Sequence, residues 1–110
     1  MGRFIKGQVV VVPFPFSDLT DYKLRPALVL APLMGDDVIL CQITTTSRGD
    51  GYSVRLDQSD FRVGTLKRES YIRPNHIFTA EESIITKSVG EINQTKIDEV
   101  IKRIVNILTN

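Results

Sequence analysis

Three stretches decide the fold: residues 7–14 (GQVVVVPF), 25–31 (RPALVLA) and 37–45 (DVILCQITT). Each is a short run rich in β-branched and other apolar side chains, which is typical of a buried strand. Gly35 and Asp36 separate the second run from the third and indicate a tight reversal. The last two runs should therefore pair as an antiparallel hairpin.

Weaker strand patterns follow at residues 52–56 (YSVRL) and 69–73 (ESYIR), and we expect the second to end at Pro74. Short strands joined by Gly, Pro and Asp turns favour a small, strongly curved antiparallel barrel over a parallel sheet. No linker or repeat divides the chain, so residues 1–110 are expected to form one domain.

The C-terminal segment has a helical pattern. Apolar residues recur there at helical spacing: Ile97, Val100, Ile101, Ile104, Val105 and Leu108. Thr95 and Asp98 have the spacing of a capping box at the helix start. The fold class is therefore mainly β with a C-terminal helix that covers an open end of the barrel.

Composition excludes several classes of protein. The 110 residues are 42% hydrophobic and 25% charged, with a formal charge of +1, which argues against a general coating agent for DNA or membranes. Cys41 is the single cysteine, so no internal disulfide is possible and a reducing compartment is favoured. We read neither a signal peptide nor a transmembrane segment in the sequence, and therefore expect a cytoplasmic location and no membrane partner.

The sequence contains no common cofactor or metal motif. It has no Cys/His cluster, no P-loop and no GxGxxG, so we predict no metal and no cofactor. Cys41 lies within VILCQI and is expected to be a small core residue. Because His76 is the single histidine, a mechanism with a histidine pair is excluded.

The remaining candidate functional groups are arginine guanidinium groups and threonine hydroxyl groups. Arg25 stands directly before Pro26, and Thr44 to Thr46 close the third apolar run. If the hairpin forms, Arg25 and the threonines lie at the same end of the barrel. A guanidinium beside a hydroxyl makes a good phosphate clamp, because its fixed fork of donors matches phosphate oxygens. A simply solvated arginine is the alternative.

Three longer stretches carry a family resemblance: residues 7–31 (GQVVVVPFPFSDLTDYKLRPALVLA), 38–45 (VILCQITT) and 69–83 (ESYIRPNHIFTAEES). In this order and spacing they resemble the MazF/PemK (Kid) family of toxin endoribonucleases from bacterial toxin–antitoxin pairs. The most specific pieces are the opening G-x-V-x-x-V-x-F, the R-P-A-L-V-L strand and the I-T pair.

The resemblance implies an SH3-like barrel that pairs as a homodimer and cuts single-stranded RNA at short sequences without a metal. The ribose 2′-OH would attack the adjacent phosphate and leave a 2′,3′-cyclic phosphate and a 5′-OH. The family's R-P arginine matches Arg25, and its I-T threonine matches Thr44, which are the predicted catalytic residues. A cognate antitoxin would be the protein partner, and DNA would be bound only through the antitoxin complex.

One position departs from the Kid branch of the family. Arg73 matches that branch's arginine, but its acid position, two residues later, holds Asn75. An asparagine orients a hydroxyl and cannot accept its proton. The general base is therefore left open. His76 is the nearest titratable group in the sequence, and an ordinary packing histidine is the alternative.

Single-stranded RNA is commonly bound by stacking of bases on aromatic rings and by cationic contacts to phosphates. The predicted RNA-binding residues are Phe16, Ser17, Asp18, Tyr22, Lys23 and Arg48. Phe16 and Tyr22 would stack on bases, whereas Phe14 is expected in the core. Two other functions stay open: a non-catalytic toxin of the same fold that binds DNA gyrase, and an inactive relative that keeps antitoxin or RNA binding.

Overall fold

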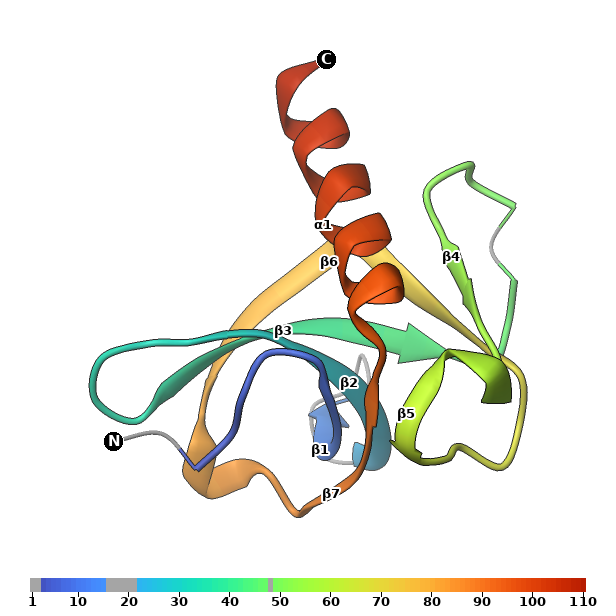
Figure 1. Ribbon diagram of the computed structural model, residues 1–110. Coiled ribbons are helices and arrows are strands. Elements are labelled where there is room, and N and C mark those ends of the chain that lie inside the picture. Colours follow the sequence, from blue (N-terminus) through green and yellow to red (C-terminus); the bar gives the residue numbers. More distant parts are fainter. Residues whose placement is uncertain (1–2, 16–21, 48) are drawn as a thin grey trace.

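The computed structural model describes residues 3–15, 22–47 and 49–110. Within this part of the chain, seven strands form one antiparallel sheet in the order β4-β6-β3-β2-β1-β7-β5, which curls into a half-barrel (Figure 1). The elements are β1 (Gln8–Pro15), β2 (Tyr22–Pro32), β3 (Asp37–Thr44), β4 (Val54–Leu56), β5 (Phe61–Gly64), β6 (Ser70–Glu81), β7 (Lys87–Ile92) and the helix α1 (Gln94–Thr109), with short 3₁₀ turns at Gln58–Asp60 and Glu82–Ile84.

The predicted fold class is confirmed: a mainly β domain with a C-terminal helix. The three apolar runs become the adjacent strands β1, β2 and β3, and β2 and β3 form the expected hairpin, with Leu28 opposite Cys41. Val9 and Val10 of β1 are both fully buried although neighbouring side chains of a strand point to opposite faces. The central strands are therefore covered on both faces.

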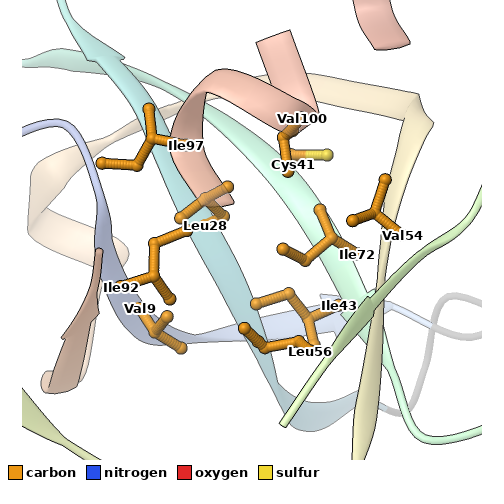
Figure 2. Close-up of a cluster of buried hydrophobic side chains, with 10 residues drawn as sticks. All are labelled: Val9, Leu28, Cys41, Ile43, Val54, Leu56, Ile72, Ile92, Ile97 and Val100. Carbon is orange, nitrogen blue, oxygen red and sulfur yellow. The ribbon is translucent and has the colours of Figure 1, made fainter. Parts of the chain in front are cut away.

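Two apolar clusters cover these two faces. The first lies between the sheet and the start of α1 (Figure 2) and contains Val9, Leu28, Cys41, Ile43, Val54, Leu56, Ile72, Ile92, Ile97 and Val100. The second contains Val10, Val12, Ala27, Val29, Val38, Leu40, Ala80 and Ile85. The expectation that Cys41 is a core residue is confirmed, because its side chain is fully buried.

The helix begins one turn earlier than its apolar stripe. Asn93, rather than Thr95, is the N-cap, and its side chain accepts a hydrogen bond from the backbone N–H of Lys96 at 2.8 Å. Ile97 and Val100 are buried, whereas Leu108 is 76% exposed, because the C-terminal half of α1 projects beyond the sheet (Figure 1). In the described part of the chain, no helix is long and apolar enough to cross a membrane.

The expectation that the strand at residues 69–73 ends at Pro74 is wrong. β6 continues through Pro74 to Glu81, although a proline has no N–H to donate to a ladder. The strand tolerates this proline because its pairing with β3 is interrupted there. Ile72 pairs with Ile43 and Ile77 pairs with Cys41, so residues 73–76 stand opposite Gln42 alone.

Strands β5 and β7 carry no clear pattern in the sequence. Their pairing depends on a close backbone approach at Gly64 and Gly90, which are register partners. A Cβ added at Gly64 would stand 2.2 Å from the carbonyl oxygen of Val89, and Gly64 also has a φ of +74°. This backbone contact joins two segments that are distant in the sequence, so the hydrophobic pattern of the sequence does not predict it.

Candidate active site

The hairpin register places Arg25 and Thr44 together. Ala27 of β2 pairs with Gln42 of β3, and Arg25 and Thr44 each lie two residues beyond this pair, toward the same end of the hairpin. Both side chains are half-buried. They line a cavity of about 660 Å³ at the end of the hairpin, as the phosphate-clamp hypothesis requires.

The same cavity receives side chains from four strands and two loops. Its described lining is Phe14, Arg25, Pro26, Gln42, Ile43, Thr44, Thr45, Thr46, Arg68, Arg73 and His76. Three of these residues are arginines and three are threonines, and no carboxylate belongs to the set. The cavity therefore offers cationic and hydroxyl donors to an anion.

The interruption of the β3–β6 ladder brings Arg73 and His76 into the cavity. Nη1 of Arg73 donates a hydrogen bond to Oε1 of Gln42 at 3.0 Å. Nδ1 of His76 contacts the same oxygen and lies 3.5 Å from Nη1 of Arg73. One amide oxygen of β3 thus holds two side chains that are three residues apart on β6.

Further contacts restrain this cluster. The Cys41 thiol donates a hydrogen bond to the carbonyl oxygen of Arg73 at 2.8 Å, and burial raises the pKa of that thiol to about 12. The ring of His76 packs edge-on against Phe14, with centroids 5.9 Å apart, and lies 6.0 Å from the ring of Phe78. The Nε atom of Arg73 is buried with no partner among the described residues.

Thr44 keeps its hydroxyl proton available. Its Oγ1 accepts a hydrogen bond from the backbone N–H of Thr46 at 3.2 Å. A hydroxyl that accepts one bond still donates its own O–H, so Thr44 has a donor for an oxygen in the cavity. The turn after β3 therefore orients this residue.

The predicted residues separate into three groups. Arg25, Thr44, Arg73 and His76 line the cavity together. Asn75 does not line this cavity. It is exposed and lines another recess, between β6 and the end of α1. Lys23 is exposed on β2 and is not among the described lining residues. Phe16, Ser17, Asp18 and Arg48 fall outside the described residues, as does the side chain of Tyr22.

Sequence reasoning missed three lining residues, namely Gln42, Arg68 and Phe14. Phe14 is half-buried rather than a full core residue, and it borders the cavity beside His76. Gln42 stands two positions before Thr44, so the two residues share a strand face. That alternation is the one signal that pointed to Gln42. Nothing in the sequence placed Arg68 near the hairpin.

Solved structures define the class to which this fold belongs. A mycobacterial endoribonuclease in complex with its cognate antitoxin superposes with a TM-score of 0.75 at 19% identity, covering 96% of this chain and 94% of that one. A structure of MazE–MazF from Deinococcus radiodurans superposes with a TM-score of 0.72 at 20% identity, covering 96% of this chain and 95% of that one. Mycobacterium tuberculosis toxin MazF-mt6 superposes with a TM-score of 0.68 at 19% identity, covering 90% of this chain and 95% of that one. The fold is that of the MazF toxins.

A family model identifies the family to which the chain belongs. Residues 5–108 match the model described as the PemK-like, MazF-like toxin of type II toxin–antitoxin systems. The chain belongs to this family and is a MazF-like toxin. The resemblance stated from the sequence motifs is thereby confirmed. No curated protein matches the sequence.

Proposed function

We propose that this toxin is a metal-independent, sequence-specific endoribonuclease that cleaves single-stranded RNA, with mRNA as its cellular substrate. The ribose 2′-OH attacks the adjacent phosphorus, the bond to O5′ breaks, and the products carry a 2′,3′-cyclic phosphate and a 5′-OH. The neighbours named as endoribonucleases support this activity. The observation that carries the proposal is the arginine- and threonine-lined cavity at the end of the β2–β3 hairpin.

Arg25 and Thr44 act on the phosphate. The guanidinium of Arg25 neutralises the charge that grows on the phosphoryl oxygens, and the Thr44 hydroxyl donates a hydrogen bond to one of them. Arg73 adds a second guanidinium to the same cavity. An arginine is protonated at all ordinary pH values, so its role here is electrostatic rather than that of an acid.

The donor set favours chemistry without a metal ion. A magnesium-dependent nuclease holds its ion mainly by carboxylates, and none lines the described part of this cavity. Its three arginines supply the positive charge that a metal would otherwise bring.

The RNA strand extends beyond the scissile phosphate. Phe14 near the end of β1 and Thr45 and Thr46 after β3 line the cavity, and we assign the contacts with bases and flanking phosphates to the segments that follow these strands. We assign six residues of these segments and of the start of β2 to RNA binding: Phe16, Ser17, Asp18, Tyr22, Lys23 and Arg48. Stacking and cationic contacts of this kind are the usual means of binding single strands.

The toxin acts in the cytoplasm and is inhibited by a cognate antitoxin, through which alone the pair binds DNA. Complexes with antitoxins among the structural neighbours support this partner. A second copy of the chain covers the apolar face at the end of α1. There a recess of about 230 Å³ is lined by Pro74, Asn75, Ile77, Ile104, Ile107 and Leu108. Large exposed apolar patches of this kind mark protein interfaces.

One experiment tests the activity, its independence of metal and its sequence preference. A long synthetic RNA is digested with the purified toxin in EDTA, and the new 5′-OH ends are mapped. We expect cleavage at a recurring short sequence, with cyclic phosphate on the upstream product. Intact RNA under all conditions would favour a non-catalytic toxin that binds gyrase or an inactive relative, and a strict requirement for added magnesium would contradict the proposed chemistry.

A further inference from the structure

A second cavity adjoins the one that we assign to the scissile phosphate. It has a volume of about 450 Å³, and its described lining includes Pro13, Phe14, His76, Phe78, Ala80 and Ile84. Phe14 and His76 also line the first cavity. The two cavities therefore share a border, and a polymer held in the first passes directly beside the second. We call the second one the aromatic cavity.

The curl of the sheet builds the aromatic cavity from strands that are not neighbours. Phe14 lies near the end of β1 and Phe78 lies on β6, and β2 and β3 separate these two strands in the sheet. In a flat sheet, three strand spacings would hold the two backbones about 14 Å apart. In the half-barrel, the centroids of the two rings are 5.0 Å apart. The curvature thus brings both rings to one place.

The two rings hold each other in position. They meet nearly edge to face, with 84° between their planes, an arrangement that aromatic pairs favour. Phe14 and Phe78 also pack against the second apolar cluster, yet each is half-buried rather than fully enclosed. The cavity therefore presents a preformed aromatic surface, and a ligand that binds there orders few side chains.

The two cavities differ in their chemistry. The first offers guanidinium and hydroxyl donors, which suit the oxygens of a phosphate. The described lining of the aromatic cavity is largely apolar, and its volume lies within the range of about 300–1,000 Å³ that is usual for ligand sites. A ligand that occupies both cavities must join an anion to a flat apolar group over a short distance. A nucleotide has this composition, and unstacked bases of single-stranded RNA bind on aromatic side chains.

We propose that the aromatic cavity binds the base of a nucleotide next to the scissile phosphate, and that this base stacks on Phe78. This inference rests on the proposed function. The phosphate lies with Arg25 and Thr44, and the base lies across the shared border at Phe14. The cavity thereby contributes to the choice of cleavage sequence. An apolar side chain of a protein partner is the alternative occupant, and it would make no use of the adjacent arginines.

Phe78 is suited to the test because it is not among the described lining residues of the first cavity. The probe is a synthetic RNA that spans the mapped cleavage sequence and carries a 2′-deoxynucleotide at the site, so that it binds without being cut. Loss of one stacking contact weakens binding about 5- to 150-fold. We expect Phe78→Leu to raise Kd within this range, and Phe78→Tyr, which restores a ring, to recover most of the loss. Fluorescence anisotropy measures Kd.

Abasic RNAs show whether the ring of Phe78 acts on a base. Two further probes lack one base each, on the 5′ or the 3′ side of the scissile phosphate, and keep the ribose-phosphate backbone. We expect one of them to bind the unmodified toxin as weakly as the intact RNA binds Phe78→Leu. For that probe, Phe78→Leu should raise Kd no further. If Phe78→Leu raised Kd equally for the intact RNA and both abasic RNAs, the proposed stacking would be wrong.

Phe4→Leu is the matched control. Phe4 is also half-buried against the second apolar cluster, but it is not among the described lining residues of the aromatic cavity. This variant should bind and cleave RNA like the unmodified toxin. Thermal unfolding followed by circular dichroism establishes that each variant is folded under the conditions of the binding assay.

The outcomes separate the two proposals. If the unmodified toxin cleaves RNA and Phe78→Leu keeps its Kd, the base-binding role is wrong while the nuclease function stands. If Phe78→Leu keeps its Kd for RNA but escapes inhibition by the cognate antitoxin, the cavity belongs to the protein partner instead. If the unmodified toxin does not cleave RNA, both proposals fail.

Discussion

Arg25 and Thr44 come from different strands and line the same cavity because of the register of one hairpin. Each lies two positions beyond the pair Ala27–Gln42, and a shift by one position would turn one of the two side chains to the opposite face of the sheet. Their neighbours Ala27 and Ile43 are fully buried, which fixes this register. The core thus determines the geometry of the site.

Replacing Arg25 should abolish cleavage while leaving the fold intact. The side chain is half-buried at the cavity and belongs to neither apolar cluster. We expect Arg25→Ala to lower kcat/KM by about 10²–10³-fold, the usual effect of losing one group that stabilises transition-state charge. Cleavage of a synthetic single-stranded RNA measures it.

Arg62→Ala is the matched control for charge. Its guanidinium is exposed and pairs with Glu91 at 2.9 Å, on strand β5, which β1 and β7 separate from β2 in the sheet. Surface ion pairs contribute little to stability, so this variant should keep both fold and activity. If Arg25→Ala and Arg62→Ala lowered kcat/KM equally, the overall positive charge, and not Arg25 in the cavity, would account for RNA binding.

Cys41 should be unreactive in the folded protein. Burial raises the pKa of its thiol to about 12, so the reactive thiolate is scarce at pH 8. Iodoacetamide should modify the chain slowly under native conditions and rapidly in guanidinium chloride, as followed by mass spectrometry. Because the pKa in the folded protein exceeds the thiol's ordinary value of 9.0, this group also lowers the free energy of unfolding as the pH rises from 9 toward 12. Rapid native alkylation would contradict the burial of Cys41.

At the scale of elements, the bulge in β6 explains how a strand contains a proline and also contributes two side chains to the cavity. Pro74 is buried, and the residues around it are released from pairing with β3. Arg73 and His76 turn to one side and Asn75 to the other. In an unbroken strand, side chains alternate, and Arg73 and His76 would lie on opposite faces.

The β5–β7 pair predicts a difference between two glycine variants. Gly64 and Gly35 both have a positive φ, and a Cβ would meet the backbone of Val89 and Gly90 only at Gly64. Gly35→Ala should therefore cost about 1 kcal/mol from the left-handed backbone alone. Gly64→Ala should cost clearly more, and urea unfolding followed by circular dichroism measures both. Equal costs would mean that β5 and β7 are not in close contact.

For the whole molecule, the two apolar clusters leave apolar side chains exposed around the end of α1. Ile77 is 41% exposed, Val105 is 50% exposed and Leu108 is 76% exposed, and Ile77 and Leu108 border the same recess. The C-terminal half of the helix projects beyond the sheet, so the end of its apolar stripe remains largely exposed (Figure 1).

Oligomeric state tests the role of this surface. The toxin should be a dimer at about micromolar concentration, and Leu108→Glu should make it monomeric, because a carboxylate would be buried in the interface. Met34→Glu is the control, since Met34 is 98% exposed on the β2–β3 turn. Light scattering gives the mass of each variant. A monomeric unmodified toxin, or a dimer that persists in Leu108→Glu, would remove this face from the proposed dimer.

The sequence by itself determined the three central strands, the C-terminal helix and the placement of Arg25 and Thr44 at one end of the hairpin. These features depend on local apolar patterns and on a short turn, so neighbouring residues specify them. The tertiary structure alone decided that β6 continues past Pro74, that Gly64 meets Gly90, and that Gln42 holds Arg73 and His76. Those contacts join segments about 25 to 35 positions apart, and their energy comes from packing and hydrogen bonds that no local pattern records.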